Sequence, residues 1–153
     1  MNEQLEWQDD WLLGIDQFDD EHREMVRLIN RLLDDDDDTP VQQRVSDLVV
    51  HLRMHFKREE EFLRRIDYPG YCEHKHEHKM ELAEVVVLLD KMNNDQNPVF
   101  DPFFALNIKY WFLNHVVLED KRFAVFFFQE RNGFVDEDAT LPGEPPCFQF
   151  DDD

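Results

Sequence analysis

One stretch of this 153-residue chain places polar groups where a helix would bury apolar ones. Over residues 48–66, leucine, phenylalanine and isoleucine recur every three or four positions, which makes one apolar stripe. His55 and Glu59 continue that stripe four residues apart, so both side chains would point into a helical core. Burying an imidazole and a carboxylate without partners is costly, and a metal ion bound by both would remove the cost.

Three more stretches of helical periodicity are interrupted by histidine in the same way. The histidines on the apolar stripes are His22, His55, His74, His78 and His115. A single core histidine is more often a structural residue bonded to the backbone. Five of them together with a carboxylate favour a metal site. His51 and His76 fall off the stripes, so we expect both at the surface.

The number and type of these groups indicate which metals would fit. The pairs His55/Glu59 and His74/His78 each have i, i+4 spacing and can each bind one centre. Five imidazoles and a carboxylate are too many ligands for one tetrahedral zinc ion. They suit two carboxylate-bridged ions of a nitrogen-preferring metal such as iron, copper or nickel. Carboxylate-rich di-iron bundles use Glu-x-x-His instead, so the His-x-x-x-Glu pattern here points away from that class.

Four amphipathic helices must position these side chains. Periodicity predicts them over residues 15–32, 40–66, 71–92 and 102–129, separated by "DDDDD", "DYPGY" and "NNDQNP". Thr39-Pro40 and Asp101-Pro102 each resemble an N-cap followed by proline at the first helical position. Short connections predict an all-α fold, an up-down-up-down antiparallel four-helix bundle with an N-terminal arm. Residues 1–132 would form this domain and residues 133–153 an acidic, proline-containing tail.

Composition narrows the possible partners and the compartment. The net charge of −20 argues against nucleic acid and anionic membrane as partners, and the acidic runs are expected to be solvated. No apolar stretch approaches the roughly 18 residues of a membrane helix. The N-terminus lacks the features of a signal peptide, so we expect a cytoplasmic protein. Cys72 and Cys147 lie far apart without a C-x-x-C pair, and both are predicted to be thiols. A monomer is the default, because a bundle can bury its core alone.

The order of these motifs resembles the hemerythrin family, in particular its stand-alone bacterial type, the bacteriohemerythrins. The matching stretches are "GIDQFDDEH", "HFKREEEFL", "YPGYCEHKHEH" and "WFLNHVVLED", which span roughly residues 5–128. The resemblance implies a non-haem di-iron centre with an oxo or hydroxo bridge. One iron would be bound by His74, His78 and His115. The other would be bound by His22 and His55, with Glu59 and Asp120 bridging, and dioxygen would bind reversibly at its open position.

Two positions depart from a simple reading of this pattern. Glu21 stands where the family very often has glutamine; a surface glutamate is favoured over a hydrogen bond to a ligand. From His115, an ideal helix would bring Glu119 nearer the stripe, since the i+5 residue lies about 140° round the axis. The family pattern nevertheless selects Asp120. We therefore predict a local π-type turn that rotates Asp120 inward.

Apolar residues within about a turn of the ligands are expected to line an oxygen pocket. They are Met25, Phe56, Trp111, Phe112, Val116 and Leu118. A dry pocket excludes water and proton donors, which slows autoxidation and favours reversible binding over turnover. The expected function is oxygen storage or delivery, without enzymatic activity. Oxygen or redox sensing is one alternative, and ferroxidase or peroxidase activity is another. No protein partner is indicated.

The tail leaves two structural alternatives. A disordered tail is favoured by its polar, proline-bearing composition. The other is that Phe148 and Phe150, which alternate to one side of an extended chain, dock on the bundle. In neither case does the tail supply a ligand. Its removal is therefore expected to leave oxygen binding unchanged and to cost at most modest stability.

Overall fold

The structure is a computed structural model that describes residues 4–95, 101–138, 140–141 and 143–147. Its helices are α1 (Asp16–Leu32), α2 (Val41–Arg65), α3 (Tyr71–Asn93), α4 (Pro102–Phe112) and α5 (Asp120–Glu130). A π-helical segment, η2 (Leu113–Glu119), joins α4 to α5, so these three elements form one continuous fourth rod. A short 3-10 turn, η1 (Asp9–Trp11), lies in the N-terminal arm. No strand occurs among the described residues.

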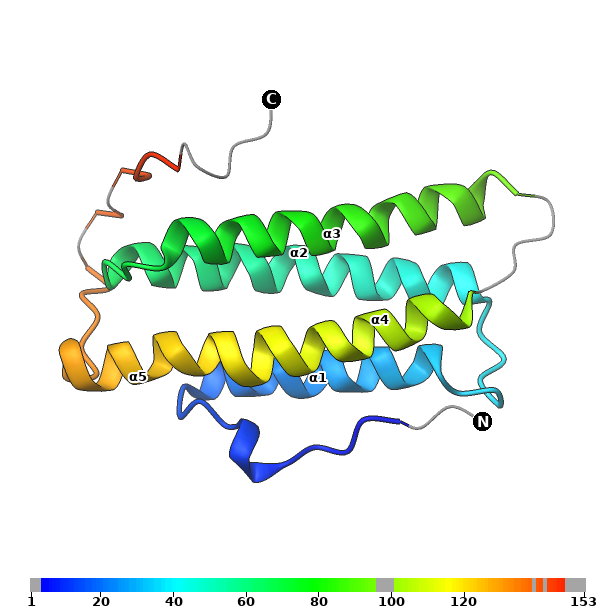
Figure 1. The fold of residues 1–153 in the computed structure, drawn as a ribbon, viewed down its shortest axis with the longest axis horizontal. Coiled ribbons are helices and arrows are strands. Elements are labelled where there is room, and N and C mark those ends of the chain that lie inside the picture. The colour runs from blue at the N-terminus through cyan, green and yellow to red at the C-terminus, as the bar shows by residue number, and fades with distance from the viewer. Residues whose placement is uncertain (1–3, 96–100, 139, 142, 148–153) are drawn as a thin grey trace.

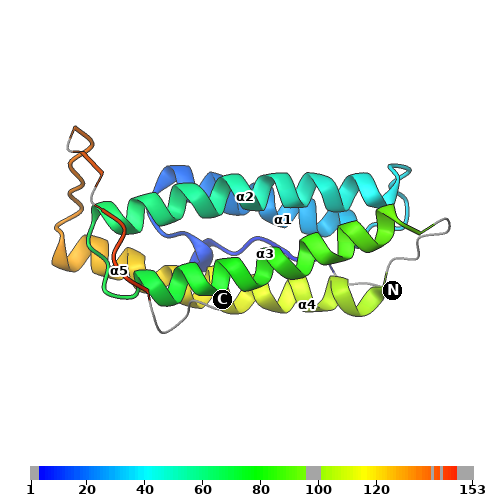
Figure 2. The same cartoon turned by 90° about the horizontal axis from the view of Figure 1, so that it is seen from above.

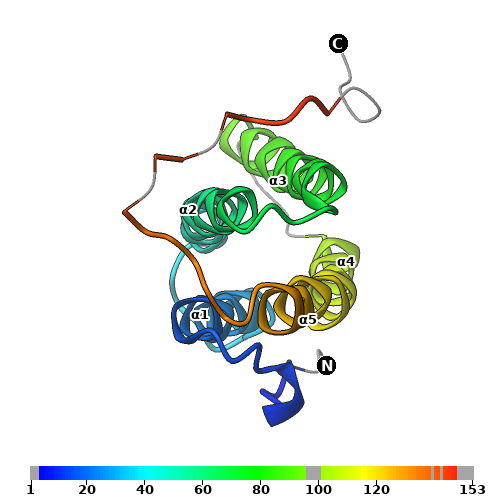
Figure 3. The ribbon, with the colours of Figure 1, turned by 90° about the vertical axis from the view of Figure 1, so that its left-hand side faces the viewer.

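The four rods pack as the predicted antiparallel bundle, which is confirmed. In Figure 1, α2 and α3 lie side by side, and α1 lies beside the α4–η2–α5 rod. Figure 2, from above, shows α1 next to α2 and α3 next to α4, so each rod has two neighbours. Viewed along the axis in Figure 3, the rods surround one shared interior. The apolar stripe of each rod therefore faces the same interior of the bundle.

Helix ends agree with the sequence to within a residue or two, with one difference in capping. Asp101 caps α4 as predicted, because its Oδ1 accepts a 2.9 Å hydrogen bond from the Phe103 N–H. Thr39 does not cap α2: Pro40 takes the cap position, and no side chain there bonds the helix. The Thr39 N–H instead donates to Asp37 Oδ1 at 2.8 Å, within a turn of the aspartate run.

The apolar core is divided by the layer that contains the histidines. Along α1, Phe18 belongs to one apolar cluster, His22 follows, and Met25 belongs to the other cluster. The α2 helix repeats this arrangement in reverse, with Phe56, Glu59 and Leu63 in that order. Apolar packing on both sides therefore holds the polar layer in place and shields it from solvent.

The N-terminal arm is part of this core. Leu5, Trp11 and Leu13 are buried. Asn30 of α1 bonds the Leu5 backbone in both directions, at 2.7 and 2.9 Å. These paired bonds satisfy a peptide group that packing would otherwise leave unpaired, so the arm is fixed along α1.

The C-terminal segment returns to the start of α3, where Cys72 and Cys147 form a disulfide across 75 residues. The expectation that both cysteines are thiols is therefore wrong. Sequence spacing could not show the contact, because the tail has no periodic pattern that would place it on a helix. Phe148 and Phe150, the residues proposed for docking, lie outside the described residues. None of the helices in the described ranges is long and apolar enough to cross a membrane.

Candidate metal centre

The seven predicted ligands meet in one buried layer inside the bundle. Each is at most 4% exposed to solvent. Their ligand atoms form two groups that could each hold a metal ion. One group consists of Glu59, His74, His78 and His115, and the other of His22, His55, Glu59 and Asp120.

Glu59 is shared between the two groups. Its Oε1 lies 2.6 Å from His74 Nε2 and 3.1 Å from His78 Nε2. Its Oε2 lies 3.0 Å from His55 Nε2 and 3.7 Å from His22 Nε2. One oxygen thus faces a three-histidine set (His74, His78 and His115), and the other faces a two-histidine set (His22 and His55). This arrangement is suited to bridging two ions.

Asp120 spans the same two sets. Its Oδ1 lies 2.9 Å from His74 Nε2 and 3.3 Å from His115 Nε2. Its Oδ2 lies 3.1 Å from His22 Nε2. Although both oxygens are buried, neither makes a well-directed hydrogen bond with any described residue. Buried carboxylate oxygens without such bonds are destabilising unless a cation binds them, so the donor set fits metal ions.

The fourth rod brings Asp120 to this layer through its π-helical segment. The η2 segment begins two residues before His115 and ends at Glu119. A π turn accommodates one more residue than an α turn, so the i+5 residue comes close to the face of residue i. Asp120 is completely buried, whereas the Glu119 side chain is 29% exposed. The predicted π-type turn is confirmed.

A second ring of carboxylates holds the far side of three imidazoles. His55 Nδ1 lies 2.6 Å from Glu21 Oε1, His78 Nδ1 lies 2.7 Å from Glu60 Oε2, and His115 Nδ1 lies 3.0 Å from Glu77 Oε2. Since a carboxylate can only accept, each Nδ1–H donates and each Nε2 is directed toward the centre. Glu60 and Glu77 were not among the predicted site residues. In the sequence, each is marked only by standing beside a predicted ligand: Glu60 follows Glu59, and Glu77 precedes His78.

Glu21 belongs to this ring, so its assignment to the helix surface is wrong. It is buried against α2, and its Oε2 also accepts a 2.8 Å bond from Arg58 Nη1. Burial alone would raise the pKa of Glu21, but hydrogen bonds from His55 and Arg58 outweigh burial and lower that pKa. The glutamate is therefore charged. It holds His55 in the way that the less favoured reading of this position suggested.

The buried carboxylates make the layer strongly attractive to positive charge. Burial lowers the pKa of His55, but the charge of Glu59 and the bonds to Glu21 and Glu59 raise it to about 10. His74 behaves alike, because its contacts with Asp120 and Glu59 overcome burial and raise its pKa to about 10. Burial raises the pKa of Glu59, yet neighbouring histidines hold it well below its ordinary value. The layer is thus built to accept cations.

Five of the six expected pocket residues are buried or half-buried, and one is exposed. Met25, Phe56, Phe112 and Val116 are buried, and Trp111 is half-buried with its ring stacked on His115 at 5.1 Å between centroids. Phe56 stacks on His78 with 4.0 Å between centroids. Leu118 is 56% exposed, so it does not line a buried pocket. It lies within the π segment, whose altered register turns it toward solvent.

The two histidines outside the stripes belong to neither ligand group. His51 is nevertheless half-buried: its Nε2 lies 2.8 Å from the Glu21 carbonyl oxygen and donates to it. Burial lowers the pKa of His51 despite that bond. His76 is also half-buried. Both are therefore less exposed than predicted, although neither faces the centre.

Comparison with known proteins gives a consistent result. Residues 13–126 match the family model described as the Hemerythrin HHE cation binding domain. The chain is 26% identical over 125 residues to a bacteriohemerythrin of Clostridium acetobutylicum, covering 76% of this chain and 96% of that protein. It is 26% identical over 123 residues to a bacteriohemerythrin of Stenotrophomonas maltophilia, covering 78% and 79%. An Aquifex aeolicus bacteriohemerythrin is 34% identical over 80 residues, which are 50% of this chain and 61% of that protein.

Proposed function

The chain belongs to the hemerythrin family, and from this premise we propose that its buried layer holds two iron ions and binds dioxygen reversibly. The family description and the donor set both support a cation-binding domain. A pair of ferrous ions, when bound, supplies the two electrons needed to hold dioxygen and recovers them on release. The role proposed for the protein is oxygen storage or delivery, without catalytic turnover.

One observation carries this proposal: the two ligand sets share their carboxylates but differ by one histidine. The three-histidine set and the two-histidine set both face Glu59 and Asp120. An ion held by His22 and His55 would have one protein ligand fewer than an ion held by the three-histidine set. Such an ion would keep a coordination position for a small molecule.

The surroundings favour binding over reaction. Apolar clusters enclose the layer on both sides, and Met25, Phe112 and Val116 are wholly buried. Such packing keeps water and additional proton donors away from a bound molecule. The carboxylates of Glu21, Glu60 and Glu77 each accept a hydrogen bond from an imidazole Nδ1, so they orient the ligands rather than act as free acids or bases.

The test is anaerobic loading with ferrous iron, followed by optical spectra as oxygen is added and removed. We expect two irons per chain and an absorption band that appears with oxygen and disappears when oxygen is removed. A band that never reverses would contradict oxygen carriage. Continuous consumption of hydrogen peroxide without a stable oxygenated form would instead indicate peroxidase activity.

A pair of variants shows whether the layer is responsible. His55→Ala removes a ligand from the two-histidine set, and we expect it to lower the iron content below two per chain and to abolish the band. His51→Ala is the matched control, one helical turn earlier, and should retain both irons. Equal iron loss in the two variants would contradict the assignment of the layer.

A further inference from the structure

A polar groove lies between α2 and α3 on the outside of the bundle. Its volume is about 500 Å³. Five cationic side chains line it: Arg53, Lys57, Arg64, Lys75 and Lys79. The chain has only 16 lysines and arginines against 36 aspartates and glutamates, so this concentration of positive charge is unusual for the molecule. The groove is therefore a place where an anion is attracted, on a surface that otherwise repels it.

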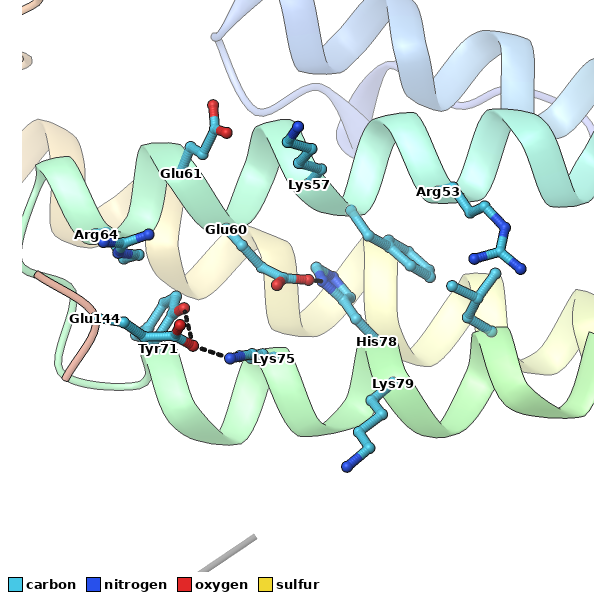
Figure 4. Close-up of a pocket in the computed structure, with 12 residues that line it drawn as sticks. Arg53, Lys57, Glu60, Glu61, Arg64, Tyr71, Lys75, His78, Lys79 and Glu144 are labelled. Carbon is cyan, nitrogen blue, oxygen red and sulfur yellow. Dashed lines mark hydrogen bonds and ion pairs between the residues drawn. The ribbon is translucent and has the colours of Figure 1, made fainter. Parts of the chain in front are cut away.

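The helices supply little negative charge to balance these cations. Glu60 and Glu61 are the acidic groups from α2 in the groove. Glu60 already accepts a bond from His78 Nδ1 at the floor of the groove, as Figure 4 shows. Among the described residues, Arg53, Lys57 and Lys79 form no ion pair, so the groove has capacity for further carboxylates.

One carboxylate from elsewhere in the chain occupies the groove. Glu144, in the C-terminal segment, forms an ion pair with Lys75. The Tyr71 hydroxyl donates to Glu144 Oε1 at 3.1 Å. Figure 4 shows both contacts at one end of the groove, beside Arg64. The segment thus places one carboxylate in the groove, as a bound peptide would.

These contacts alone would hold the segment weakly. The side chains of Lys75 and Glu144 are 37% and 45% exposed, so water and salt screen their attraction. The disulfide supplies the missing constraint, because Cys147 lies three residues after Glu144 and Cys72 lies three residues before Lys75. A tether this short raises the effective concentration of the carboxylate to about the millimolar range or above.

We propose that the groove between α2 and α3 is a binding site for carboxylate-bearing peptide segments, which the C-terminal segment occupies fully in the disulfide form and only part of the time when Cys72–Cys147 is reduced. Both cysteines are half-buried, so a small dithiol can reach the bond. One thiolate of the dithiol attacks one sulfur and releases the other as a thiolate. The second thiol then closes the reductant's own disulfide. Two electrons pass from the dithiol to the cysteine sulfurs, and Cys72 leaves readily because a helix N-terminus favours its thiolate.

The experiment measures binding of a fluorescent peptide to the full chain by anisotropy. The peptide has the sequence of residues 140–147 and carries Cys147→Ser, so it cannot form the disulfide. We expect no measurable binding to the oxidised chain, and binding to the chain reduced with dithiothreitol and to Cys72→Ser. Adding Glu144→Gln to Cys72→Ser should tighten binding, because the internal competitor loses its charge.

Charge reversal locates the site. In the Cys72→Ser chain, Lys75→Glu should weaken peptide binding at least tenfold. Lys91→Glu, on the same helix but outside the groove, should change binding less than twofold. Circular dichroism checks that each variant is folded. Equal binding before and after reduction, no binding after reduction, or equal losses from Lys75→Glu and Lys91→Glu would each overturn the proposal.

Discussion

Glu21 shows how one side chain outside the ligand set can control the centre. It accepts from His55 Nδ1 and from Arg58, so it fixes the imidazole and keeps electron density on its Nε2. The family very often has glutamine here, which can accept the same bond without the charge. The glutamate adds an ionic contact to α2 and should make His55 a stronger ligand.

Glu21→Ala should weaken iron binding by about 10–100-fold, as is typical when the partner of a metal-ligating histidine is lost. Glu21→Gln should lose less, because its amide oxygen can still accept from Nδ1. Chelator competition measures both affinities. Glu24→Ala is the control on the same helix, since Glu24 bonds Arg27 at the surface and should have no effect. A Glu21→Ala variant with unchanged iron affinity would contradict this role.

Iron loading should release protons. The pKa values of His55 and His74 are about 10, so at pH 7 both imidazoles are protonated before metal binds. Coordination requires their neutral form. We expect at least two protons per chain at pH 7, and iron affinity that rises with pH between 7 and 10. A pH indicator followed during anaerobic titration gives the count. Metal uptake without proton release at pH 7 would show that these imidazoles are already neutral.

At the level of elements, the π segment η2 corrects a mismatch of one residue. His115 and Asp120 are five positions apart, which an α-helix would place on different faces. The same segment keeps the buried residues of α4 in register with Phe123 and Phe127 of α5. The wide turn thus behaves as an α-helix with one extra residue inserted.

Deleting Leu118 should therefore restore a regular helix and keep the centre. His115 and Asp120 would become i and i+4, and the lost side chain is mostly exposed. We expect two irons per chain and unchanged circular dichroism. Deleting Lys121 is the control: it leaves the spacing from His115 to Asp120 but rotates Phe123 and Phe127 out of the core, so stability should fall by several kcal/mol. Iron loss on deleting Leu118 would mean that the π geometry itself is required.

The helices and the histidine layer could be predicted because both depend on short-range spacing. A period of three to four residues identifies each rod, and the same period identifies the histidines that interrupt its stripe. Asp120 could not be chosen in this way, since an ideal helix favours Glu119. It required the family pattern.

The burial of Glu21 and the disulfide, which were both predicted wrongly, depend on contacts between distant segments. The burial of Glu21 depends on α2, which brings His55 and Arg58 to it. The exposure of Leu118 has a local cause, because the π-type turn was predicted but the outward position of Leu118 within it was not. Cys72 and Cys147 meet only because the tail returns from the end of α5 to the start of α3. Neither of the two distant contacts has a periodic signal in the sequence.

At the level of the whole molecule, the disulfide changes what the tail contributes. It closes a loop of 75 residues that includes α3, α4 and α5. In the chain-entropy model, a loop of this length restricts the unfolded state by about 4 kcal/mol, part of which is offset by ordering the tail. The sequence alone suggested that removing the tail would cost little.

Cys72→Ser should therefore lower the free energy of unfolding by about 2–4 kcal/mol. Guanidinium chloride titration of the oxidised chain and the variant measures the difference. Cys147→Ser should lose the same amount, and the double variant no more, because each change removes the same bond. Truncation after Gly133 should match them and leave the oxygen spectrum unchanged. Additive losses would show that a cysteine contributes apart from the disulfide.

The disulfide also determines which metal ligands would separate first if the molecule were stretched. Pulled from its two ends, the chain can extend only through residues outside the loop. The segment enclosed by the disulfide would measure roughly 260 Å if fully extended, and this length cannot be pulled out while the bond is intact. His22, His55 and Glu59 lie outside it, whereas the three-histidine set and Asp120 lie within it. Under tension, α1 and α2 would therefore separate from the bundle first. The α3 helix and the fourth rod would stay joined by the disulfide, which would bear the force.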